Sequence, residues 1–136
     1  RLLRDHHSAR WYFAEMAPVD DMTAFRAYYE TARKCGGVRF GIYTKAFRVL
    51  EHAEMAPANF AVNMSLTNRL PNYEETRLAM DKGYQFFIYD DGTNPELAEY
   101  YHCPAQGKDG RTGVTCEQCG RCYTAKAGRV TCVDAH

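Results

Sequence analysis

Residues 60–89 read FAVNMSLTNRLPNYEETRLAMDKGYQFFIY, and this stretch decides the fold of the 136-residue chain. It begins and ends with near-continuous apolar runs, Phe60–Leu66 and Tyr84–Tyr89, which are typical of strands buried on both faces. Between the runs, Asn72 and Glu75 have the spacing of a capping box, which predicts a helix. A strand, a helix and a second strand in this order predict a parallel sheet with a right-handed crossover.

The same alternation of strands and helices extends toward the N terminus. Apolar residues recur at helical spacing from Met22 to Ala32, and Gly36-Gly37 supplies a C-terminal stop. Other runs, rich in aromatic or alternating apolar residues, predict further strands. The expected strands are 10–15, 38–44, 60–66 and 84–89, and the expected helices follow Asp20-Asp21 and cover 45–52, 73–82 and 96–101.

This pattern predicts an α/β fold, either a partial (β/α) barrel or an open parallel sheet. A closed eight-stranded barrel needs about 250 residues, so the chain supplies at most part of one. The composition changes after Asp90-Asp91-Gly92, because the remainder is rich in Gly, Thr and Cys and poor in large aliphatic residues. We therefore expect an α/β region over residues 1–101 and a cysteine-rich, metal-binding tail over 102–136 that is docked on it.

The charge balance indicates neither a nucleic-acid nor a membrane partner. Lys and Arg total 17, as do Asp and Glu, so the formal net charge is zero. No apolar run approaches the roughly 20 residues that a membrane helix needs. The chain starts at Arg1 and lacks the apolar run of a secretion signal, so we expect that an N-terminal part precedes it or that a partner chain completes the sheet.

Five of the six cysteines lie in the last quarter of the chain. Cys116, Cys119 and Cys122 follow one another at intervals of three, and Cys103 can close a four-thiolate shell. Structural zinc sites usually combine two separated Cys-x-x-Cys pairs, whereas three closely spaced cysteines with one remote cysteine are typical of iron–sulfur loops. The spacing favours a [4Fe–4S] cluster, with Zn²⁺ or unliganded thiols as alternatives.

Three further residues are alternative ligands. Cys132 could replace Cys103, although the flanking valines favour a short strand in which the thiol packs. His102 or His136 could complete a Cys₃His zinc site. Adjacent residues rarely bind the same tetrahedral ion, which favours Cys103 over His102 and leaves the histidine as a supporting or surface residue. Cys35 has no neighbouring thiol in the sequence, so we expect a structural role for it.

Polar residues at the ends of the predicted strands form a second candidate site. The C-terminal ends of parallel strands meet at one edge, where ligands of α/β proteins bind. Loops after strands are polar in general, and Asp and Asn there cap helices, so we expect a minority of the set to bind a small molecule. The candidates are Glu15, Thr44, Lys45, Ser65, Asn68, Asp90 and Asp91.

Four short segments, together with the strand and helix order, carry a resemblance to a known family. They are residues 43–45 (YTK), 65–68 (SLTN), 103–106 (CPAQ) and 119–123 (CGRCY). With them, the chain resembles the C-terminal part of the phage gene product 88-like family. The resemblance implies a relation to radical S-adenosylmethionine enzymes. It also implies that an upstream cysteine motif holds the S-adenosylmethionine-binding cluster, with an auxiliary cluster on the present cysteines.

Two functions follow from these observations. The first is a radical-enzyme-like iron–sulfur protein with a small-molecule site at the strand ends, whose substrate and catalytic residues the sequence does not name. The second is a non-catalytic, zinc-stabilised module that binds protein or nucleic acid. Both need reduced cysteines, so we expect the cytoplasm of the host cell as the location.

Overall fold

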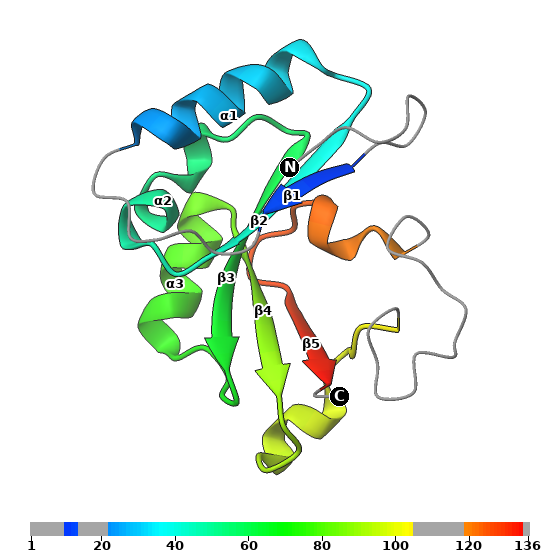
Figure 1. Cartoon of the computed structure of the whole chain (residues 1–136). Helices are drawn as coiled ribbons and strands as arrows, with labels where there is room; N and C mark the ends of the chain where they lie inside the picture. Colours follow the sequence, from blue (N-terminus) through cyan, green and yellow to red (C-terminus); the bar gives the residue numbers. More distant parts are fainter. Residues whose placement is uncertain (1–9, 14–21, 105–118, 135–136) are drawn as a thin grey trace.

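The computed structural model describes residues 10–13, 22–104 and 119–134. Within these residues, five parallel strands form one sheet in chain order, β1-β2-β3-β4-β5 (Figure 1). The edge strands β1 and β5 do not pair with each other, so the described sheet is open and no closed barrel forms. The strands are β1 (Arg10–Phe13), β2 (Arg39–Thr44), β3 (Phe60–Thr67), β4 (Gln85–Asp90) and β5 (Val130–Asp134).

Helices cover one face of this sheet. The elements α1 (Thr23–Lys34), α2 (Phe47–Glu51), η1 (Ala53–Met55) and α3 (Tyr73–Lys82) connect the first four strands. Figure 1 shows α1, α2 and α3 on the same side of the sheet, as right-handed crossovers between neighbouring parallel strands require. The short 3₁₀ helix η2 (Pro95–Glu99) follows β4, and η3 (Arg121–Tyr123) lies on the opposite face. None of the described helices has the length and apolar composition needed to cross a membrane.

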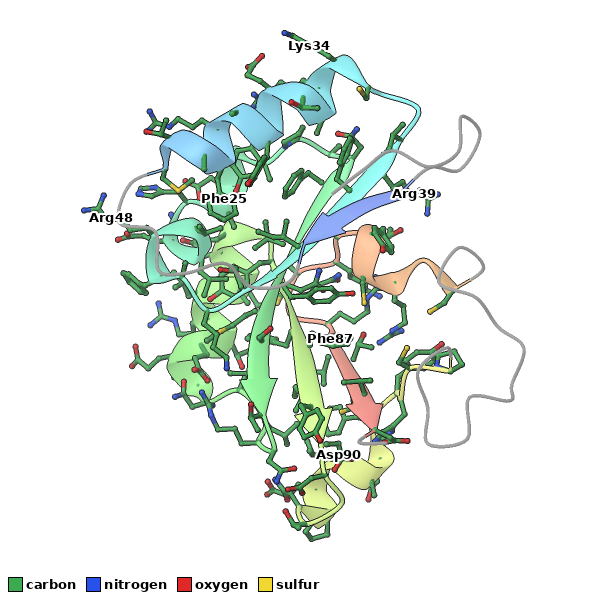
Figure 2. The ribbon with its side chains drawn as sticks, viewed as in Figure 1. Phe25, Lys34, Arg39, Arg48, Phe87 and Asp90 are labelled. Carbon is green, nitrogen blue, oxygen red and sulfur yellow. The ribbon has the colours of Figure 1, made fainter. Side chains whose placement is uncertain are left out.

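The core lies between the helices and the sheet. The residues at helical spacing in α1 are buried, and Phe25 points from α1 toward the sheet (Figure 2). The matching sheet face is apolar, because every second residue of the central strands enters the same cluster. Its members include Phe40 and Ile42 of β2, Phe60, Val62 and Leu66 of β3, and Phe86 and Ile88 of β4.

The predicted elements are largely confirmed, with three differences. The helix expected over 45–52 begins at Phe47, because the Thr44 hydroxyl accepts a hydrogen bond from the Ala46 amide and delays the first turn. The helix expected over 96–101 is the 3₁₀ helix η2, which stops at Glu99 because the chain then runs along β5. The short strand expected around Cys132 is a fifth strand of the sheet, so this part of the predicted tail shares one sheet with the α/β region.

The capping box of α3 is confirmed and carries a charged group. The Glu75 amide donates to Asn72 Oδ1, and Glu75 Oε1 accepts from the Asn72 amide, both at 2.8 Å. The same carboxylate accepts two hydrogen bonds of 2.8 Å from Arg69. The hydrogen bonds from Arg69 lower the pKa of Glu75; burial opposes this, while the Asn72 amide and the charge of Arg69 add to it.

Replacing Glu75 by glutamine should make the stability less dependent on pH. A carboxylate with a lowered pKa stabilises the folded state above its unfolded value of 4.5, and this contribution is lost as the pH falls through the lowered pKa. Glutamine keeps the cap but loses the charge. We expect the free energy of unfolding of the wild type to exceed that of the Glu75→Gln variant by about 0.5–1 kcal/mol at pH 7. The difference is small because Arg69 is half exposed and solvent screens the pair.

Urea denaturation at several pH values measures this difference. We expect it to shrink as the pH falls below 4.5 and to disappear below the lowered pKa of Glu75, where the carboxylate is protonated in both states. A difference that persists unchanged at low pH would show that the Arg69 pair does not carry it.

Candidate functional site

The sheet face opposite the helices has small and polar residues at its centre. Gly41, Asn63 and Gln85 lie on three neighbouring strands and alternate with residues of the apolar core. A Cβ atom on Gly41 would lie 2.5 Å from the carbonyl oxygen of Cys122. Because that neighbour is backbone, the absence of a side chain at Gly41 is what lets the cysteine segment approach the sheet so closely.

Hydrogen bonds fix this segment on the sheet. Asn63 Nδ2 donates to the Cys122 carbonyl at 3.0 Å, and Gln85 Nε2 donates to the Arg121 carbonyl at 2.9 Å. Gln85 Nε2 also donates to Asn63 Oδ1, while Gln85 Oε1 accepts from the Lys126 amide, both at 3.0 Å. Asn63 and Gln85 are buried, so unmade bonds there would be costly. The face holding Gly41, Asn63 and Gln85, here called the docking face, therefore positions η3 and Cys122.

Cys103 reaches the same side of the sheet along the edge of β5. The Cys132 amide donates to the Tyr101 carbonyl at 2.8 Å, and the Cys103 amide donates to the Cys132 carbonyl at 2.6 Å. His102 and Cys132 form a parallel bridge. In an extended segment successive side chains point to opposite faces, so Tyr101 and Cys103 lie on one face and His102 on the other.

Tyr101 connects Cys103 to the η3 segment. Its hydroxyl lies 3.6 Å from Cys119 Sγ, and the Arg121 guanidinium lies 4.0 Å from the centre of its ring. The hydrogen bond with Cys119 raises the pKa of Tyr101, and burial and the charges of Cys119 and Cys103 act in the same direction. Cys103 and Cys119 therefore flank one tyrosine, although they are far apart in the sequence.

Two arginines lie beside these thiols. Burial and the charge of Arg121 lower the pKa of Arg129, and the charges of Cys122 and Cys119 oppose this shift. Arg129 Nη2 donates to the carbonyls of Arg121 and Thr124. Its Nε is buried and has no hydrogen-bond partner in the described part of the chain. A buried donor in this position suits an acceptor that the described residues do not supply.

The described cysteines are not in disulfides, and Cys103, Cys119 and Cys122 are each partly exposed. Their three sulfur atoms do not all lie within 4.8 Å of one another. Among the described residues, a different group of side chains meets this distance. Cys116, the fourth predicted thiolate, lies outside the described residues, as do His136 and Glu15.

That other group is Asp90, His102 and Asp134, at the C-terminal ends of β4 and β5. The register places Asp90 directly opposite Asp134, and Figure 2 shows Asp90 at the lower edge of the sheet. His102 Nε2 lies 3.0 Å from Asp90 Oδ2 and 3.4 Å from Asp134 Oδ1. His102 Nδ1 lies 2.7 Å from the Tyr100 carbonyl, and Asp90 Oδ1 accepts a hydrogen bond from the Gly92 amide.

The charges of this group are coupled. The hydrogen bond to His102 lowers the pKa of Asp90, against the effect of burial. Burial lowers the pKa of His102, but its hydrogen bonds to Asp90 and to the Tyr100 carbonyl and the charges of Asp134 and Asp90 together raise it. His102 therefore points toward two aspartates. Because successive side chains of this extended segment point to opposite faces, it lies away from Cys103 and the other thiols.

A family-model comparison identifies the chain. The model described as Gene product 88 matches residues 19–125, most of the chain. The chain belongs to the Gene product 88 family. This confirms the resemblance at the level of a phage protein family, and the matched residues include the docking face and Cys103, Cys119 and Cys122. Comparisons with curated proteins and with solved structures gave no significant match.

Cys132 has a different setting in this Gene product 88 member. It is completely buried in β5, and burial, with the charges of Asp90 and Asp134, raises the pKa of its thiol to about 11. A thiol that resists ionisation is a poor metal ligand. The placement agrees with the packing role expected from the flanking valines, so Cys103 remains preferred over Cys132 as the ligand that joins Cys116, Cys119 and Cys122.

Most other strand-end candidates have structural partners. Thr44 caps the turn before α2 through its hydroxyl, and Asp91 accepts hydrogen bonds from Thr93. Asn68 has a positive φ of 57°, a conformation that asparagine tolerates, and its side chain bonds Thr93 and the Asp91 amide. Lys45 is exposed and Ser65 is partly buried. Among the described strand-end candidates, Asp90 joins a cluster of ionisable groups.

A groove of about 670 Å³ lies on the other side of the molecule, between α2 and α3. Its lining shares no residue with the thiols, with the Asp90 group or with the predicted strand-end candidates. The lining residues are Phe47, Leu50, Met64, Glu74, Glu75, Arg77, Leu78, Asp81 and Tyr84. The groove is therefore separate from both candidate sites.

Proposed function

We propose that this Gene product 88 member is an iron–sulfur protein. In this proposal Cys103, Cys119 and Cys122 bind a [4Fe–4S] cluster, with Cys116 as the fourth thiolate expected from the sequence. The observation that carries the proposal is the shared Tyr101 contact, by which the edge of β5 brings Cys103 beside the segment that holds Cys119. Such a cluster supplies one-electron transfer when bound.

The spacing of the thiols along the chain supports a cluster over zinc. Three cysteines at intervals of three residues, with one remote cysteine, are typical of iron–sulfur loops, whereas structural zinc sites usually combine two separated Cys-x-x-Cys pairs.

The neighbouring cations support the same proposal. Arg121 and Arg129 lie beside Cys119 and Cys122, where they would offset the negative charge of a thiolate-bound cluster. Arg129 Nε, which has no hydrogen-bond partner among the described residues, and the Tyr101 hydroxyl are donors that can bond to cluster sulfur atoms. Donors near such sulfur atoms are among the features that set cluster potentials.

The relation to radical S-adenosylmethionine enzymes is part of the proposal, as is a small-molecule site at the C-terminal edge of the sheet. Parallel strands in chain order are the arrangement expected of a partial (β/α) barrel. The chain has no Cys-x-x-x-Cys-x-x-Cys motif, so an S-adenosylmethionine-binding cluster would require cysteines outside these 136 residues. The cluster proposed here would then be auxiliary, and the reduced thiols that it needs suit the host cytoplasm.

Metal and sulfide analysis of anaerobically purified protein tests the proposal. We expect a brown protein with broad absorption near about 400 nm and about four irons and four sulfides per chain. One zinc per chain without sulfide would contradict the cluster proposal and support the zinc-stabilised module. In that case, salt-dependent DNA binding would separate a nucleic-acid partner from a protein partner.

A further inference from the structure

We propose that Asp90, His102 and Asp134 form a binding site for a divalent transition-metal ion, distinct from the cysteines. The group lies where β4 and β5 end, on the edge at which parallel α/β sheets bind their ligands. It combines one imidazole nitrogen with two carboxylate oxygens, a donor set suited to ions such as Mn²⁺, Fe²⁺ and Zn²⁺.

The orientation of the imidazole requires a proton or a metal ion at Nε2. A carbonyl oxygen can only accept, so His102 Nδ1 carries the hydrogen in its 2.7 Å contact with the Tyr100 carbonyl. In the neutral ring, Nε2 would then point its lone pair at the oxygens of Asp90 and Asp134. Lone pairs facing one another repel, so either a proton or a metal ion must lie between them.

The charge of the group favours the metal. Two carboxylates on directly paired residues of neighbouring strands repel each other. An imidazolium leaves the group with a net charge of −1, whereas a divalent ion on the neutral imidazole brings it to zero. Binding through Nε2, with Nδ1 donating to a backbone carbonyl, is also the usual arrangement of a metal-bound histidine.

The distances fit a coordination shell. With metal–ligand bonds of about 2.1 Å, adjacent ligand atoms lie about 3.0 Å apart in octahedral and about 3.4 Å apart in tetrahedral coordination. The two separations from His102 Nε2 are 3.0 and 3.4 Å. Asp90 is held by the Gly92 amide through its other oxygen, while the side chains of His102 and Asp134 are 24% and 30% exposed. An ion can therefore enter and retain positions for water or an oxygen-donor ligand.

Mn²⁺ is the probe that separates this site from the thiols, because it prefers oxygen and nitrogen to thiolate ligands. Electron paramagnetic resonance of the full chain titrated with Mn²⁺ should show about one bound ion. The Asp134→Asn variant should weaken binding at least about tenfold, and His102→Gln should do the same. Asp91→Asn, which removes a neighbouring exposed carboxylate outside the group, should leave the affinity within about twofold.

The Cys119→Ser variant should bind Mn²⁺ as the wild type does, so the result is independent of the cluster proposal. Circular dichroism establishes that each variant is folded. No binding by the wild type up to about 1 mM Mn²⁺, equal affinities for Asp134→Asn and Asp91→Asn, or loss of binding in Cys119→Ser would each overturn the metal site. The first two results would indicate that a proton on His102, and not a metal ion, holds Asp90, His102 and Asp134 together.

Discussion

The Cys119→Ser variant is expected to lose the proposed iron–sulfur cluster. Cys119 lies in the segment docked over Asn63 and Gln85 and beside Tyr101, so its loss opens the thiolate shell where the two segments meet. Iron should fall from about four per chain to fewer than about one, with a matching loss of sulfide. Hydrogen exchange should accelerate at the amides of residues 119–129 while α3 stays protected.

Two other cysteines provide matched controls. Cys35 lies at the end of α1, so Cys35→Ser should retain the full iron content. Cys132→Ala should also retain iron but unfold more easily, because the buried thiol packs in the core. Unchanged iron in Cys119→Ser, or iron loss in Cys132→Ala equal to that in Cys119→Ser, would contradict the proposed ligand set.

The Asn63→Ala variant is expected to lose about 2–4 kcal/mol of unfolding free energy. The side chain of Asn63 is buried, donates to the Cys122 carbonyl and accepts from Gln85 Nε2. Alanine leaves these partners without their bonds and opens a small cavity, and each unmade buried bond costs about 1–3 kcal/mol. The variant should also bind less iron, because Cys122 loses a contact that positions it.

Urea denaturation followed by circular dichroism measures the loss. Thr67→Ala, an exposed change at the end of the same strand, should cost less than about 0.5 kcal/mol. A loss below about 1 kcal/mol in Asn63→Ala would show that solvent satisfies the freed groups and that the docking face is less tightly closed than its hydrogen bonds indicate.

Local signals in the sequence account for most of the described fold. The capping box at Asn72 and Glu75 and the left-handed Gly83 define both ends of α3, and the predicted bounds 73–82 are the observed ones. These signals act within one turn of helix, so they can be read without knowing the tertiary structure. The spacing from Met22 to Ala32 likewise identified buried residues, since burial follows the helical period.

The candidate sites depended on contacts that no local pattern contains. Asn63 and Gln85 stand inside apolar strands, and a buried polar residue there was the available signal for the docking face. Their partners lie 59 and 36 residues further along the chain. From the sequence, His102 is an alternative to Cys103 as a metal ligand, but the alternation of side chains along the segment beside β5 directs it toward Asp90 and Asp134. Strand register decides both outcomes, and register is a property of the assembled sheet.

The strand order also has a consequence for how the protein is made. Since β1 to β5 pair in chain order, each new strand can join the edge left by the one before it as the polypeptide leaves the ribosome. Gly41, Asn63 and Gln85 are all synthesised before Cys122, which follows Gln85 by 37 residues. At about 5–20 residues per second, synthesis of the docking face is complete roughly 2–7 s before Cys122 is added. The cysteine segment would then find the docking face already synthesised, which shortens the time in which its exposed thiols can oxidise or mispair.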